Sequence, residues 1–94
     1  MLTLQSTVSI PAEVLFNRLD DGEAILLNLG TGKYYGLDAV GSRMWALLVQ
    51  HGQIELAYRA LLLEYAVTPE KLQHDLIALV EKLAAQQLLT IHEV

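Results

Sequence analysis

The sequence contains no cysteine, which excludes disulfide bonds, thiolate metal sites and cysteine nucleophiles. Positive charge is scarce as well, because Lys and Arg total 6 against 11 Asp and Glu, and the formal net charge is −5. Such an acidic chain is a poor candidate for nucleic-acid binding, whose affinity comes largely from Lys and Arg at phosphates. Long apolar runs are also missing: segments such as Ala24–Leu27 are far shorter than the roughly 20 residues of a membrane helix.

The N-terminus has no basic segment followed by an apolar stretch, so the sequence predicts no secretory signal. The lack of cysteine fits a reducing compartment, and we expect a soluble, cytoplasmic protein with no membrane partner. The chain has 94 residues, of which 53% are hydrophobic and 18% charged. This composition excludes general disorder and predicts one folded domain over residues 1–94.

The first half of the chain is rich in turn signals and short β-prone runs, which predict a small antiparallel sheet over about residues 7–37. Glycine-containing turns separate its later strands, at 20–22 and 30–32. Segment 23–29 is a nearly continuous apolar run, a pattern typical of a strand buried on both faces. The last segment is short and contains a glycine, so we expect it at an edge. The predicted strands are Thr7–Ile10, Val14–Leu19, Glu23–Leu29 and Lys33–Leu37.

The second half predicts three helices, over about residues 39–51, 54–65 and 69–87. Asp38 and Thr68 are suited to cap the first and the third, and Gly52 to end the first. The third helix carries two neighbouring apolar rows, and is therefore wider in apolar surface than one packing face requires. Either the three helices form a tight core, or part of this surface lines a groove. The rows are Leu72, Leu76, Leu79 and Leu83, and Ile77, Val80 and Ala84.

No pattern in the sequence predicts catalysis, a metal site or a cofactor. The three histidines lie far apart and lack the spacing of zinc ligands. The serines lack the context of a nucleophile, and segment 30–33 lacks the full spacing of a phosphate-binding loop. We therefore expect a non-enzymatic protein.

An interaction surface remains as the predicted functional feature. An edge strand offers unpaired backbone groups to which an extended peptide can add as a further strand. If the third helix lies beside Lys33–Leu37, the two would form a cleft with backbone groups on one wall and apolar side chains on the other. Strand alternation predicts Tyr35 and Leu37 on one face and Tyr34 on the other.

The residues Leu27–Asp38, followed by Gly41, Met44-Trp45 and Leu47-Leu48, resemble the PqqD-like family of small peptide chaperones. These are recognition elements in pathways of ribosomally made, post-translationally modified peptides. Segment 34–37 before a helix with Gly41 and Trp45 is most similar to the stand-alone members of lasso peptide biosynthesis. The resemblance implies an α+β, winged helix-turn-helix-like fold, in which a three-stranded antiparallel sheet packs on three helices.

The resemblance also implies a partner. Family members bind the leader segment of a precursor peptide as an additional antiparallel strand beside the last strand of the sheet. In lasso pathways the leader is then presented to a transglutaminase-like cysteine protease, the leader peptidase, before an ATP-dependent cyclase closes the ring. Carried over to this chain, the peptide-binding residues are Lys33, Tyr34, Tyr35, Gly36 and Leu37 on the strand, and Leu72, Asp75, Leu76, Leu79 and Val80 on the helix.

Three alternatives stay open at this point. The same fold occurs in the chaperone of pyrroloquinoline quinone synthesis, so the resemblance implies the mode of binding and leaves the product of the pathway open. A winged-helix DNA-binding regulator is a second alternative, although the third helix offers only Lys71, Gln73 and Lys82 among acidic residues. A structural subunit of a larger enzyme is a third.

Overall fold

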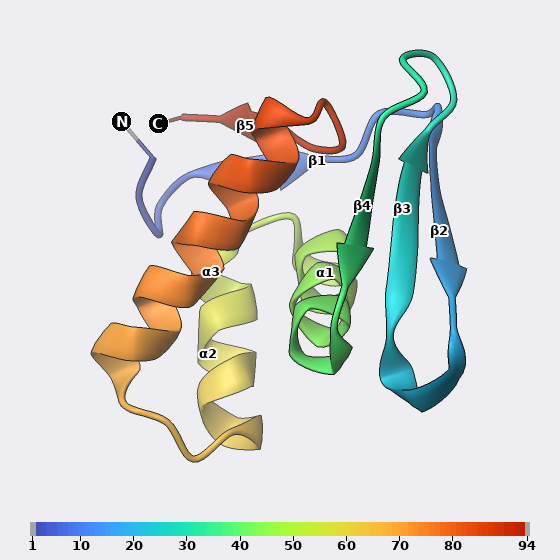
Figure 1. The fold of residues 1–94 in the computed structure, drawn as a ribbon. Coiled ribbons are helices and arrows are strands. Elements are labelled where there is room, and N and C mark those ends of the chain that lie inside the picture. Colours follow the sequence, from blue (N-terminus) through green and yellow to red (C-terminus); the bar gives the residue numbers. More distant parts are fainter. Residues whose placement is uncertain (1, 94) are drawn as a thin grey trace.

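The computed structural model describes residues 2–93 and shows the expected α+β fold, with a three-stranded antiparallel sheet and three helices (Figure 1). Met1 and Val94, the outermost residues of the predicted domain, lie outside the described residues. The elements in chain order are β1 (Thr7–Ser9), β2 (Val14–Arg18), the 3₁₀ turn η1 (Asp20–Gly22), β3 (Ala24–Asn28), β4 (Tyr34–Leu37), α1 (Ala39–His51), α2 (Ile54–Glu64), α3 (Pro69–Ala85) and β5 (Thr90–His92).

The main sheet has the strand order β2-β3-β4, and β4 lies at one edge as predicted. Its central strand is buried on one face only, which corrects the expectation for 23–29. Ala24, Leu26 and Asn28 are buried, whereas Ile25 is 37% exposed and Leu27 only half-buried. The physical reason is that the helices cover one side of this sheet and leave the other open (Figure 1).

The sheet is also shorter than predicted at its N-terminal end, because β1 does not join it. β1 pairs instead with β5, in an antiparallel register that places Val8 opposite Ile91. This pairing connects the two ends of the chain, 83 residues apart at Val8 and Ile91 (91 − 8 = 83). Sequence periodicity carries no information on such a distant partner. The residues after α3 thus include a strand, β5, that covers the start of the chain.

The predicted helix boundaries are close to those observed, because the capping residues act as expected. The Asp38 carboxylate accepts a hydrogen bond from the Gly41 amide (2.7 Å), and Thr68 caps α3 in the same way. Gly52 ends α1 with a left-handed φ of 67°. α3 ends at Ala85, two residues before the predicted boundary, since the backbone turns to a φ of 59° at Gln87.

A side-chain pair on the surface joins the first two helices. The Arg43 guanidinium donates two hydrogen bonds to the Glu64 carboxylate, at 2.8 and 2.7 Å. These hydrogen bonds from Arg43 lower the pKa of the Glu64 carboxyl, and the nearby positive charge acts in the same direction. Because both side chains are exposed to solvent, the pair orients α2 against α1 more than it stabilises the fold.

The core lies between the three helices and the covered face of the sheet. On α3, four side chains point into it: Leu72, Leu76, Val80 and Leu83, all at most 3% exposed. Leu79 and Ile77 flank this row and are half-buried. The apolar residues of this helix therefore form one buried row with half-buried residues on either side of it. They do not form the two separate rows that the sequence predicted. Within residues 2–93, no helix has the length and apolar character that crossing a membrane requires.

Candidate functional site

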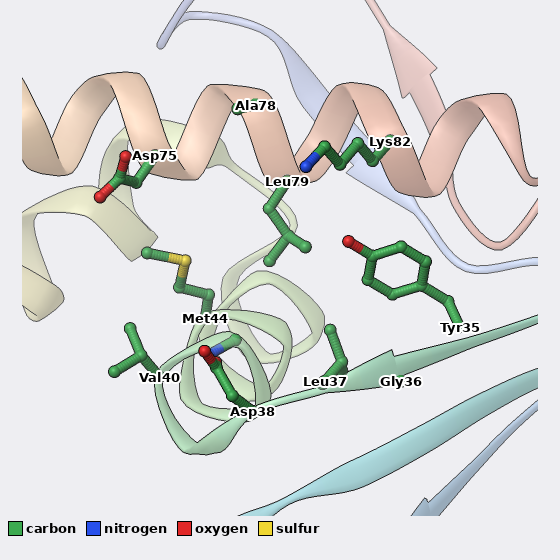
Figure 2. Close-up of a pocket in the computed structure, with 11 residues that line it drawn as sticks. Tyr35, Gly36, Leu37, Asp38, Val40, Met44, Asp75, Ala78, Leu79 and Lys82 are labelled. Carbon is green, nitrogen blue, oxygen red and sulfur yellow. The ribbon is translucent and has the colours of Figure 1, made fainter.

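A cleft of about 320 Å³ lies between the edge strand β4, the start of α1 and the middle of α3 (Figure 2). This volume is at the lower end of the range for ligand-binding pockets. The three elements contribute separate walls to it. The lining residues are Tyr35, Gly36 and Leu37 from β4, Asp38 from the connection, Val40, Gly41 and Met44 from α1, and Asp75, Ala78, Leu79 and Lys82 from α3.

The helix wall follows from the helical repeat. Asp75, Ala78, Leu79 and Lys82 have the spacing i, i+3, i+4 and i+7, which places them on one face of α3. In Figure 2, the Leu79 side chain points from this face toward α1 and β4, with Asp75 and Lys82 to either side. The centre of the cleft is therefore apolar, and its charged groups lie toward the ends.

The strand wall presents backbone groups. In the antiparallel ladder of β3 and β4, the Asn28 amide donates to the Lys33 carbonyl (2.9 Å). Hydrogen-bonded and non-hydrogen-bonded pairs alternate along such a ladder. Tyr35 and Leu37 therefore direct both of their backbone groups toward β3, whereas Tyr34 and Gly36 direct theirs away from it. At Lys33 only the carbonyl faces β3, because its N–H donates to Thr31 Oγ1 at 3.2 Å. Two N–H and two C=O groups, one of each from Tyr34 and Gly36, face the open edge.

Gly36 is not required by the packing of the fold. A Cβ atom at this position would meet no other atom within 4 Å, and the φ of Gly36 lies outside the left-handed region that favours glycine. A glycine inside a strand costs about 0.5–1 kcal/mol of stability relative to alanine. Strand glycines often mark a place where a ligand or another backbone approaches closely.

The structure brings together half of the residues predicted for the site. Five of them line the cleft: Tyr35, Gly36, Leu37, Asp75 and Leu79. Alternation on β4 is as predicted, because Leu37 is buried and Tyr35 half-buried, while Tyr34 is 72% exposed on the opposite side of the strand.

The other predicted residues lie elsewhere. Lys33 precedes β4 rather than belonging to it, and its side chain is not part of the cleft lining. Leu72, Leu76 and Val80 are buried in the core, with exposed fractions of 3%, 0% and 0%. These three side chains pack against the other elements in the core. They hold α3 in place but do not face the cleft.

Six lining residues were not predicted: Asp38, Val40, Gly41, Met44, Ala78 and Lys82. Two of them could have been predicted from the helical repeat. Ala78 and Lys82 are three and seven residues after Asp75 and therefore share its helix face. Val40 and Met44 could not, because their positions suit a core stripe of α1 equally well. Within residues 2–93, no group of His, Asp and Glu side chains is arranged to hold a metal ion.

Asn28 connects the hairpin to the end of α3 and so sets the position of β4 relative to that helix. Its Oδ1 accepts hydrogen bonds from the amides of Gly30 (2.8 Å) and Thr31 (3.1 Å). Its Nδ2 donates to the carbonyl of Gln87 (2.6 Å), just after α3. Asn28 itself is only 3% exposed, and the three hydrogen bonds are partly buried.

Replacing Asn28 with alanine should therefore destabilise the protein by about 2–4 kcal/mol, since each of three hydrogen bonds contributes about 0.5–1.5 kcal/mol. Urea unfolding followed by circular dichroism measures this loss. The matched control is Asn17→Ala on the exposed strand β2, which should change the free energy of unfolding by less than about 0.5 kcal/mol. Equal stability of the two variants would contradict the role given to Asn28.

Comparison with known proteins adds two findings. The family model described as "Coenzyme PQQ synthesis protein D (PqqD)" matches residues 23–89, a range that includes all lining residues of the cleft. The solved structure described as "TbiB1 in Complex with the TbiA(beta) Leader Peptide" is 40% identical in sequence. The similarity covers 86% of this chain and 93% of that chain, with a TM-score of 0.79. No match was found among curated proteins.

Proposed function

The chain belongs to the PqqD family, and from this membership and the cleft we infer that it is a binding protein for the leader segment of a ribosomally made precursor peptide. The leader adds to the free edge of β4 as a fourth, antiparallel strand. Its backbone pairs with the outward N–H and C=O groups of Tyr34 and Gly36. The side chains on its inner face enter the cleft between β4 and α3.

The observation that carries this proposal is the coincidence of an open strand edge with a cleft along the same strand whose centre is apolar. An edge alone would bind extended chains without selecting their sequence, and a cleft alone would not favour an extended conformation. Here Leu37, Met44 and Leu79 provide the apolar contacts directly beside the backbone groups. Gly36, which the packing does not require, lies at the centre of the same edge.

The finer role that we propose is in lasso peptide biosynthesis, in the cytoplasm. The protein has no catalytic step of its own and uses no cofactor. It holds the leader so that a leader peptidase, a transglutaminase-like cysteine protease, can remove it before a cyclase closes the ring. The similarity to a structure that contains a leader peptide supports the binding step. The resemblance of Tyr34–Leu37, followed by Gly41 and Trp45, to the lasso-type members supports the pathway.

The test of this proposal uses the leader segment of a short precursor peptide, to be sought among the genes beside this one. Isothermal titration of the full chain with the synthetic leader segment should give a dissociation constant of roughly 1 µM or below, or about 8 kcal/mol of binding free energy. The core segment of the same precursor is the control and should not bind. No binding of the leader at 100-fold higher concentration, roughly 100 µM, would contradict the proposed function.

The neighbouring genes also separate the pathways. A precursor beside genes for a transglutaminase-like protease and an asparagine-synthetase-like cyclase would support the lasso assignment. Genes for pyrroloquinoline quinone synthesis in the same place would favour the alternative product while leaving the binding mode unchanged. Tight, salt-sensitive binding of duplex DNA in a gel-shift assay would instead favour the regulator.

A further inference from the structure

We propose that the cleft selects its peptide by the order of charges along it: a basic side chain, then an apolar one, then an acidic one, at alternate positions from the N- to the C-terminal end. This inference rests on the proposed function, because it names which peptides the same site accepts. It follows from the two opposite charges at the ends of the cleft and from the direction of β4 (Figure 2).

Asp75 and Lys82 carry these charges on the helix wall. They are seven residues apart on α3, which places them on the same face with a separation of about 10.5 Å along the axis. Both line the cleft, whereas Lys71, whose Nζ donates to Asp75 Oδ2 at 3.0 Å, does not. None of the ion pairs found within residues 2–93 includes Lys82.

A second carboxylate strengthens the acidic end. Asp38 lines the cleft at the end of β4, on the side of Asp75 (Figure 2). Its Oδ1 accepts the Gly41 amide at the start of α1, which fixes the side chain in place. At the other end, Tyr35 and Lys82 line the cleft on the side away from Asp75 (Figure 2). One end of the cleft is therefore negative and the other positive.

The direction of the strand converts these charges into a sequence order. β4 runs from Tyr35, at the Lys82 end, to Leu37, below Leu79 in the middle of the cleft, and so points toward the Asp75 end (Figure 2). Each pairing described in the two sheets is antiparallel, and antiparallel pairing is slightly more stable per residue. An added antiparallel strand begins at the Asp75 end, so that its basic residue precedes its acidic one.

Strand geometry sets the spacing. Alternate side chains of a strand share a face and are about 6.8 Å apart. The inward side chain opposite Leu37 reaches Met44 and Leu79 and must be apolar. The next inward side chain, two residues later and opposite Tyr35, reaches Lys82 and is acidic. The preceding one, two residues earlier, lies toward Asp75 and is basic.

A random-peptide display library selected against the full chain tests this order. The enriched peptides should share a basic, an apolar and an acidic residue at positions i, i+2 and i+4. The double variant Asp75→Lys with Lys82→Asp keeps the net charge and should enrich the reversed order. The control Glu81→Lys changes an exposed charge of α3 outside the cleft, and should leave the enriched order unchanged.

Two synthetic peptides taken from the enriched set, with the charges in the selected and in the exchanged order, provide the second measurement. The selected order should bind about tenfold more tightly at low salt, and the ratio should shrink as ionic strength rises. Apolar peptides enriched without a charge order, or with the reversed one, would overturn this inference and leave the proposed function standing. A library from which no peptide is enriched would contradict both.

Discussion

Replacing Gly36 with proline should weaken leader binding roughly thirtyfold and leave the fold intact. The N–H of Gly36 faces away from β3, so its loss breaks no bond of the sheet, and proline is tolerated on edge strands. The added leader strand would lose one hydrogen bond and keep a carbonyl without a partner, which costs about 1–3 kcal/mol. At 1.4 kcal/mol for each tenfold change, about 2 kcal/mol corresponds to roughly thirtyfold.

Gly36→Ala is the matched control. It restores the N–H and adds only a Cβ atom, for which the structure has open space. We expect its dissociation constant to stay within about threefold of that of the parent protein, and far-UV circular dichroism to be the same for all three proteins. If the proline variant is folded and still binds the leader at full strength, the leader does not add to β4.

Replacing Leu79 with aspartate should weaken leader binding by more than about a hundredfold, because it places a carboxylate where apolar leader side chains are buried. Leu79 is half-buried on the flank of α3, so the free protein can solvate the new charge. The same change at Leu76 would be uninformative. That side chain is fully enclosed in the core, and a charge there would unfold the protein.

The matched control for this variant is Leu63→Asp. Leu63 is 90% exposed on α2 and does not line the cleft, so the same chemical change there should alter neither stability nor binding. Titration of the leader into both variants, with thermal unfolding as the check of the fold, gives the comparison. Equal affinities for the Leu79 and Leu63 variants would contradict the claim that leader side chains are buried in the cleft.

Much of the fold could be predicted because local signals decide it. Asp38, Gly52 and Thr68 specify helix ends through hydrogen bonds to neighbouring residues, and period-two alternation placed Tyr34 and Tyr35 on opposite faces. The family resemblance predicted the arrangement of a three-stranded antiparallel sheet packed on three helices. In contrast, the pairing of β1 with β5 depends on contacts between the two ends of the chain, about which neither periodicity nor turn residues carry information.

The helix wall of the cleft was only partly predictable. An apolar row shows that a helix face is covered, but not whether protein or ligand covers it. Leu76 and Leu79 are therefore equivalent in the sequence, while the structure places the first in the core and the second at the cleft. Lys82 was missed for a related reason, since a charged residue near a helix end is usually a solvated one.

Amide hydrogen exchange of the chain, followed by NMR with and without saturating leader peptide, tests the central claim most directly. The amides of Tyr34 and Gly36 should exchange rapidly in the free protein and slowly in the complex. Those of Tyr35 and Leu37, which face β3, should be protected in both states. Saturated binding with unchanged exchange at Tyr34 and Gly36 would contradict strand addition at this edge.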